Sequence, residues 1–416
     1  MIAVFKTIFG AFSVRMIGLG ISFYLNVYFA SRVSAAELGG YYTLTQLLLL
    51  LSVLYRTGLD MVIVKYSRVL GLERLKALTA FLVRSVAPQL LIGTLLLLAL
   101  TPLALNYLGW EVIVYALISV IPFSMAHLVA EYLKGRDYQN RAALLQSAAI
   151  PLITLLVFHF TSFDVIQSYL MGVLCAALLA LAWLKSAASH HAGVENESQD
   201  TQATVAQSRK IFFTVAILNV VMATADTLCL SFMTAGDDVA VYGVASRIAL
   251  LSSIVLVAVN GVIGPRFSQY WVARDIGGLR FEFLRATAGL ALVATLIFAV
   301  TLIAAKPFLN YFFGPAYAGS YPVLIILTFG QLITLSTGPV AYGLMMTKMS
   351  VYHRRSLYYA VASNLILNLV LIPPYGVMGA AVATAISLVI KNGYSFIVFW
   401  KFIRFEVLNN EIARSS

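Results

Sequence analysis

The clearest pattern in this sequence is a series of long apolar segments separated by shorter polar ones. A helix needs about 20 predominantly apolar residues to cross a bilayer, because each residue advances it by about 1.5 Å. Twelve segments meet this requirement: 8–30, 38–60, 85–105, 111–133, 142–162, 164–184, 211–233, 242–262, 283–305, 321–346, 355–373 and 377–400. No cleavage site with a polar start follows the first segment, so we expect a membrane span and not a removed signal. The pattern predicts an all-α polytopic membrane protein with about twelve transmembrane helices.

A polar stretch divides this series into two halves of six. It reads SAASHHAGVENESQDTQATVAQS and lacks aromatic residues. We expect a cytoplasmic linker at 186–210, joining an N-terminal six-helix lobe at 1–185 to a C-terminal six-helix lobe at 211–416. A weak repeat at an offset near 200 agrees with two lobes around a central cavity, although chance matches among apolar residues are an alternative. The repeat pairs Tyr42, Ser52, Asp60, Val62 and Ile63 with Tyr242, Ser252, Asn260, Val262 and Ile263.

Composition supports the membrane class. The 416 residues are 61% hydrophobic and 11% charged, whereas a soluble domain is about half apolar and about a quarter charged. Cys175 and Cys229 both fall inside apolar segments, so we expect neither a structural disulfide nor a thiolate metal site. Three prolines interrupt predicted spans and predict kinks there: Pro122, Pro151 and Pro339.

The net charge of +11 follows the predicted topology. With the N-terminus inside, 22 of the 28 lysines and arginines lie on cytoplasmic segments, and only Arg32 and Lys306 lie on outer loops. This bias predicts both termini in the cytoplasm. The basic excess then contacts anionic membrane lipids, and we expect no nucleic-acid partner.

Arginines lie in or beside three of the predicted spans, where a charge at the bilayer centre costs at least about 2.5 kcal/mol. Arg15 shares a helical face with Ser22 and Asn26 in the first span, Arg56 ends the second and Arg247 opens the eighth. If these spans face the central cavity, three guanidiniums converge on a phosphate-bearing cargo, which they bind in a bidentate manner. Snorkelling to the headgroups or an ion pair is the alternative.

Two further pairs have the spacing of helical neighbours. Arg56 can pair with Asp60 four residues on, and His127 lies four residues before Glu131. The second pair is either a proton relay or an interfacial pair beside Lys134. Tyrosines near the span ends predict an aromatic belt, with stacking on sugars as the alternative: Tyr24, Tyr28, Tyr41, Tyr42, Tyr55 and Tyr242.

Residues 355–400 predict a hairpin of two spans joined by the turn Pro373-Pro374-Tyr375-Gly376. Asn364 and Asn368 lie on one face of the first span. The second span opens with Gly379-Ala380-Ala381 and carries Thr384. Hydrocarbon offers no partner to a carboxamide, so this face must meet protein or water.

Asp226, in the middle of the span 211–233, has no basic residue near it in the sequence. Together with Asn364, Asn368 and Thr384 it offers a set of oxygens suited to a hard cation. One carboxylate suits a monovalent ion such as Na⁺ better than Ca²⁺, which usually gathers more carboxylates. A proton carried by Asp226 is the alternative, and hydrogen bonding between helices alone accounts for the asparagines.

Four segments, in this order and spacing, resemble the polysaccharide-biosynthesis membrane proteins. They are AELGGYYTLTQLLLLLSVLYRTGLDMVIVKYSR (36–68), VYGVASRIALLSSIVLVAVNGVIGPRF (241–267), FFGPAYAGSYPVLIILTFGQLITLSTGPVAYGLMMT (312–347) and NLILNLVLIPPYGVMGAAVATAIS (364–387). The chain thus resembles Wzx-type oligosaccharide (O-antigen, lipopolysaccharide) flippases of the multidrug/oligosaccharidyl-lipid/polysaccharide exporter superfamily.

The resemblance implies two six-helix lobes around a cationic cavity that opens alternately to each side. In the related lipid II flippases arginines on helices one, two and eight line the cavity, which matches Arg15, Arg56 and Arg247. Those relatives also have a sodium site formed by an Asp, an Asn, an acid and a Thr. Asp226, Asn364 and Thr384 match it. Asn368 replaces the acid, which removes one carboxylate from the site.

The resulting expectation is a flippase in a bacterial inner membrane. It would carry undecaprenyl-pyrophosphate-linked oligosaccharide units outward, coupled to Na⁺ or H⁺, with no other cofactor. Partners would be a polysaccharide polymerase and a chain-length regulator. A drug or metabolite cation antiporter of the same superfamily is the alternative. A polymerase or ligase usually carries a large outer loop, and the outer loops here are short, so we expect no enzyme.

Overall fold

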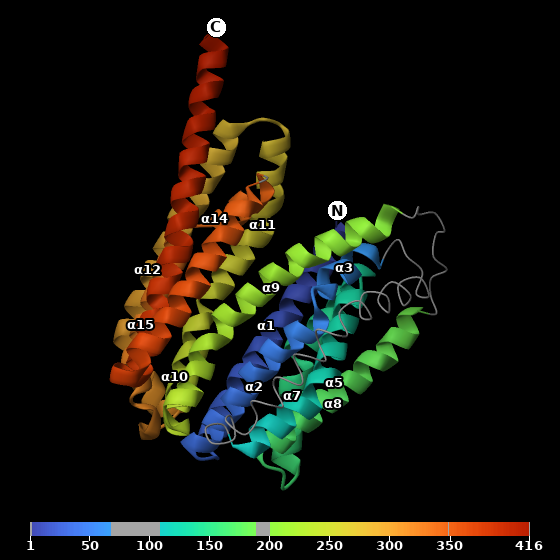
Figure 1. Ribbon diagram of the computed structural model, residues 1–416, viewed down its shortest axis with the longest axis vertical. Coiled ribbons are helices and arrows are strands. Elements are labelled where there is room, and N and C mark those ends of the chain that lie inside the picture. The colour runs from blue at the N-terminus through green and yellow to red at the C-terminus, as the bar shows by residue number, and fades with distance from the viewer. Residues whose placement is uncertain (1, 68–108, 189–199, 348, 416) are drawn as a thin grey trace. The chain divides into compact units, whose positions relative to one another are not determined.

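The computed structural model describes residues 2–67, 109–188, 200–347 and 349–415. Within these ranges the chain is helical and contains no strand. It divides into two compact units, Met1–Thr224 and Ala225–Ser416. The helices up to the start of the second unit are α1 Ile2–Ala30, α2 Ala35–Arg56, α3 Leu59–Tyr66, α5 Trp110–Gly135, α6 Gln139–Ser147, α7 Ala149–Phe160, α8 Val165–Ala188 and α9 Asp200–Met233 (Figure 1). The remainder are α10 Gly236–Leu251, α11 Ser253–Val272, α12 Ile276–Phe312, the 3-10 turn η1 Pro315–Tyr317, α13 Ser320–Ser336, α14 Val340–Met346 and α15 Ser350–Ser415.

The membrane class predicted from the apolar segments is confirmed. Among the described residues eight helices are long and apolar enough to cross a bilayer, and two bent pairs, α6 with α7 and α13 with α14, pass the same test together. The helix α15 contains both spans of the predicted hairpin. Every predicted span on described residues therefore lies on a helix or a consecutive pair of helices, and the span 85–105 lies outside the described residues.

The predicted linker is shorter than the polar composition of 186–210 suggested. Helix α8 continues to Ala188, and α9 begins at Asp200, so both ends of this range are helical. Gln, Ala and Thr are tolerated in an exposed helix turn, and polarity alone therefore does not mark where a helix ends. Residues 189–199 lie outside the described ranges. The proposed lobe boundaries stay predictions.

Two of the three predicted proline kinks are present. The chain bends by 47° between α6 and α7, where Pro151 occupies the first turn of α7, and by 41° between α13 and α14, where Pro339 is the N-cap residue. Proline is tolerated in a first turn because the amide it lacks would have no partner there. Pro122 lies inside α5, which continues past it as one helix, and a kink there stays a prediction.

In the first unit α5 is the central helix and packs against α2, α3, α6 and α8. Helix α1 packs against α6 and α7. At Gly18 of α1 an added Cβ would lie 2.7 Å from the backbone of Ser147, so glycine permits this close approach. A capping box fixes the start of α2: Glu37 N donates to Ser34 Oγ, and Ser34 N donates to the Glu37 carboxylate.

In the second unit α13 packs against α10, α12 and α15. The predicted hairpin is present as a sharp break within α15 at Gly376, where φ is 54° and ψ is −131°. The two halves run back along each other, because the hydroxyls of Ser363 and Ser387 lie 3.4 Å apart. A Cβ on Gly379 would lie 2.1 Å from the Leu371 carbonyl oxygen, so only glycine allows this turn to close.

Candidate functional site

The second unit buries a carboxylate among neutral donors. Oδ1 of Asp226 accepts hydrogen bonds from Nδ2 of Asn364 at 2.9 Å and from Nδ2 of Asn368 at 2.7 Å. Oδ2 accepts from the Tyr242 hydroxyl at 2.7 Å and from the Thr384 hydroxyl. Asp226 is 5% exposed and both asparagines are 0% exposed. The carboxylate is thus removed from water and held from three helices, α9, α10 and α15.

The local sequence explains how these side chains meet. Asn364 and Asn368 lie one turn apart in the first half of α15, and Asn368 Nδ2 also donates to Asn364 Oδ1 at 3.1 Å. The break at Gly376 returns the chain, so Thr384 faces the same carboxylate. Fully buried Ala380 and Ala381 keep the second half of the hairpin small enough to pack closely there.

The donor set fits a monovalent cation. Burying a carboxylate without a counter-charge is costly, so a bound cation is its natural partner. Asn368 Oδ1 is buried and has no hydrogen-bond partner, which leaves one oxygen available as a ligand. The carboxylate, the two carboxamides and the hydroxyls can all present oxygen, the ligand atom that hard cations prefer. The residues therefore suit Na⁺, with a proton on Asp226 as the other way to neutralise the charge.

The structure brings together all four residues of the predicted cation set, and their role as ion ligands stays a prediction. The sequence did not reveal that Tyr242 belongs to this cluster, and we had assigned Tyr242 to an aromatic belt. Tyr242 is instead 3% exposed, and its hydroxyl lies between Asp226 and Thr384, 3.4 Å from the latter. Its correspondence to Tyr42 in the weak repeat was the available signal, but it did not reveal the hydrogen bond.

The predicted cargo residues on α1 have two different environments. Arg15 is exposed on α1. Asn26 is buried, its Nδ2 donates to the Ser22 carbonyl at 2.5 Å, and its Oδ1 is buried without a hydrogen-bond partner. Arg15 is thus free to meet a large ligand, whereas Asn26 faces the interior of the first unit.

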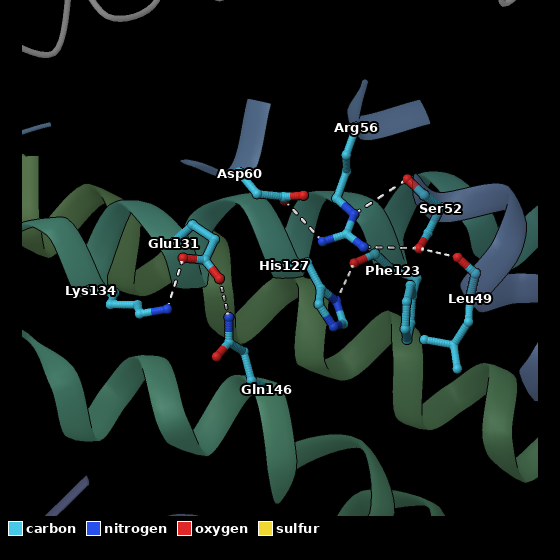
Figure 2. A network of polar contacts seen from close by, with 9 residues as sticks. All are labelled: Leu49, Ser52, Arg56, Asp60, Phe123, His127, Glu131, Lys134 and Gln146. Carbon is cyan, nitrogen blue, oxygen red and sulfur yellow. Dashed lines mark hydrogen bonds and ion pairs between the residues drawn. The ribbon is translucent and has the colours of Figure 1, made fainter. Parts of the chain in front are cut away.

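Arg56 forms the ion pair that the sequence left open. Its Nη1 donates to Asp60 Oδ1 at 2.9 Å, and Nε and Nη2 reach the Ser52 carbonyl and hydroxyl at 3.3 and 3.4 Å (Figure 2). Arg247 is half-buried in the second unit, and its Nη1 donates to the Gly243 carbonyl at 3.2 Å. The three predicted arginines belong to both units, so their convergence stays a prediction.

The pair of His127 and Glu131 on α5 belongs to a salt-bridged network. Glu131 accepts from Lys134 at 3.3 Å and from Gln146 Nε2 at 2.7 Å (Figure 2). His127 Nδ1 lies 3.0 Å from the Phe123 carbonyl oxygen and must donate to it, because a carbonyl only accepts. Glu131 thus forms an ion pair with Lys134, and no hydrogen bond joins His127 to Glu131 in Figure 2.

Comparison with solved structures gives the fold. Over 95% of this chain and 90% of the other, the structure resembles the lipid II flippase MurJ in an inward closed conformation, with a TM-score of 0.72 and 15% identity. An inward-facing multidrug resistance MATE transporter of the MOP superfamily gives a TM-score of 0.68 at 12% identity, over 96% of this chain and 98% of that one. The chain therefore has the two-lobe helical fold of MOP-superfamily transporters.

Comparison of sequences gives the family. A protein of Haloferax volcanii named "Probable low-salt glycan biosynthesis flippase Agl15" is 23% identical over 389 residues, which are 92% of this chain and 80% of the relative. The family described as "Polysaccharide biosynthesis protein" matches residues 4–271. This match spans well over half of the chain, and the protein accordingly belongs to the polysaccharide biosynthesis protein family.

Proposed function

We propose that this protein is a flippase for undecaprenyl-pyrophosphate-linked oligosaccharide repeat units. It moves them from the cytoplasmic to the outer leaflet of a bacterial inner membrane by alternating access, with both termini in the cytoplasm. The family and the similarity to a glycan biosynthesis flippase over 92% of this chain support a lipid-linked glycan as cargo. A polysaccharide polymerase and a chain-length regulator would act on the exported units.

The main support for a coupled transport mechanism is the buried Asp226 with its hydrogen-bond donors on α10 and α15. A site that binds an ion biases a two-state transporter only if the ion binds one state more tightly than the other. The carboxylate draws its donors from α9, α10 and both halves of α15, so any rearrangement of these helices changes its coordination. Binding of Na⁺ or H⁺ at Asp226 would therefore couple an ion gradient to the movement.

The cargo's pyrophosphate would be bound by guanidiniums. Arg15 is exposed and needs no rearrangement to meet an anion, whereas Arg56 is bound to Asp60 and must first be released. Arg247 would contribute from the second unit. Ser22 and Asn26 follow Arg15 along α1, and Asn26, which is buried, would have to become accessible before it could contact the cargo. A disubstituted pyrophosphate carries two negative charges, which favours arginine because its planar fork binds phosphate oxygens in pairs.

A drug or metabolite cation antiporter is the second candidate, because MATE transporters share the fold and a buried Asp226 could attract an organic cation. Intramembrane arginines favour an anionic cargo instead. The relatives named here are flippases and transporters and not enzymes.

The cargo assignment is tested by Arg15→Ala. In a strain that lacks the chromosomal copy, this variant should lose most surface-polysaccharide export and accumulate the lipid-linked unit, at unchanged protein abundance. Lys185→Ala, which removes an exposed basic side chain from the same unit, serves as the matched control and should export normally. Normal export by Arg15→Ala would overturn phosphate binding by this residue.

A further inference from the structure

The ion pair in the first unit spans a break in the second helix of the chain. Helix α2 ends at Arg56, and α3 begins at Leu59. The two residues between them have positive φ angles, 50° for Thr57 and 78° for Gly58. Arg56 and Asp60 therefore form an ion pair of 2.9 Å between two separate helices.

The break is a strained and confined point of the backbone. A β-branched residue such as Thr57 rarely adopts a positive φ, and such conformations persist where the surroundings impose them. An added Cβ on Gly58 would lie 2.8 Å from the Arg209 carbonyl oxygen and from the Phe213 nitrogen on α9. The break thus packs directly against α9 within the first unit. The ion pair connects the side chains on either side of this break.

Charged and titratable groups surround Asp60 from each described helix that packs against this point. Helix α2 contributes Arg56, and α5 contributes Glu131 and Lys134 (Figure 2). Helix α5 also places His127 below the Arg56 guanidinium, and α9 brings the backbone of Arg209 to the break. Glu131 has Lys134 and Gln146 as partners, and among the residues drawn in Figure 2 Arg56 alone forms an ion pair with Asp60.

This environment makes Asp60 prone to take up a proton. Asp60 is the last residue of the predicted span 38–60 and lies in the first turn of α3. The Asp60 side chain is 19% exposed and has the Arg56 guanidinium at 2.9 Å as its counter-charge. Without that counter-charge, burial favours the neutral carboxyl over the carboxylate. The protonated form is therefore within reach once Arg56 leaves.

We propose that Asp60 is a proton-binding site that controls Arg56: when Asp60 takes up a proton, the ion pair across the α2–α3 break opens and the guanidinium becomes available to a phosphate-bearing ligand. This inference rests on the proposed function, in which Arg56 contacts the pyrophosphate. No covalent bond changes, because one proton binds to Asp60 and Arg56 exchanges one anion for another. The exchange is reciprocal, so ligand binding at Arg56 also draws a proton onto Asp60.

A binding titration at several pH values tests the link. The purified full-length protein in detergent is titrated with a short-chain prenyl pyrophosphoryl sugar, whose two phosphates each carry one fixed charge, so the ligand itself does not titrate. The wild type should bind more tightly as the pH falls from about 8 to about 5, by up to about tenfold per unit for one linked proton. Asp60→Asn should bind at least as tightly as the wild type at high pH and should lose this dependence. Asp164→Asn, which removes an exposed carboxylate at the start of α8, should keep it.

Glu131→Gln provides a second test that leaves the ion pair intact. Removing this neighbouring negative charge lowers the proton affinity of Asp60, so the pH dependence should move to lower pH. Proton uptake on ligand addition in weak buffer should be present in the wild type and absent in Asp60→Asn. Binding with identical pH profiles in wild type and Asp60→Asn overturns the inference and leaves the proposed function standing. Failure of every form to bind at any pH overturns both.

Discussion

The two units bury their carboxylates in different ways, because one is paired with a cationic side chain and the other is held by neutral donors. In the first unit Asp60 meets the full positive charge of Arg56 at 2.9 Å. In the second, Asp226 accepts four hydrogen bonds from neutral groups of Asn364, Asn368, Tyr242 and Thr384. The first carboxylate has a cationic partner, whereas the second has only neutral ones, and we propose that a cation or a proton supplies its counter-charge.

The helix geometry of the two sites is similar, so it does not show which of them is paired with a charge. Each involves helical neighbours four residues apart and a break in a long helix, at Thr57-Gly58 and at Gly376. What differs is the kind of donor. Hydrogen bonds to a charged group contribute about 1.5–3 kcal/mol each, and leaving such a group buried without its partner costs more than that.

The largest expected effect is on the ion pair. Arg56→Ala should lower the free energy of unfolding by about 2–4 kcal/mol, because it leaves Asp60 without its counter-charge in a mostly buried position. Thermal unfolding in detergent, followed by circular dichroism, measures the loss. The double variant Arg56→Ala with Asp60→Ala should recover much of it, and a double variant as unstable as the two single losses added together would show that the pair is not coupled.

A smaller effect is expected where the relatives carry an acid. Asn368→Asp adds a second carboxylate beside Asp226, and it should tighten Na⁺ binding by about tenfold, equivalent to about 1.4 kcal/mol. The shift of the unfolding temperature with Na⁺ concentration reports the affinity, with K⁺ or choline as the control ion. An unchanged or weakened response to Na⁺ would show that residue 368 does not contribute to Na⁺ binding.

The smallest effect is expected at Tyr242. Tyr242→Phe removes one hydrogen bond of 2.7 Å to Asp226 and keeps the ring, so it should cost about 0.6 kcal/mol, the average for side-chain hydrogen bonds between membrane helices. It should also shift the half-maximal ion concentration by a few-fold. Tyr317→Phe, a buried tyrosine of the same unit, is a control that should leave the ion response unchanged.

The sequence predicted the helices and part of the site, because both leave periodic patterns. Spans appear as apolar runs, and the hairpin appears as Pro373-Pro374-Tyr375-Gly376 between two of them. Asn364 and Asn368 were predictable as a pair, because residues four apart share a helical face. Thr384 and Asp226 were added because a carboxylate and a hydroxyl inside apolar spans need polar partners, and the family resemblance implied the same set.

The remainder depends on contacts between distant segments. Tyr242 lies 16 residues from Asp226, and the sequence gives no rule that turns its hydroxyl toward that carboxylate. The left-handed break at Thr57-Gly58 was also missed, because a glycine within an apolar segment does not by itself reveal a positive φ. The extension of α9 back to Asp200 was missed for a similar reason, since polar residues form helix turns readily.

The central claim is that Asp226 couples an ion gradient to the movement of a lipid-linked oligosaccharide. Purified protein in liposomes, loaded with a fluorescent lipid-linked oligosaccharide, can be given a Na⁺ gradient or a pH gradient while the labelled lipid reaching the other leaflet is measured. The wild type should translocate faster under one of these gradients, and Asp226→Asn should lose that acceleration while it remains folded. Equal gradient-driven translocation by wild type and Asp226→Asn would contradict the account.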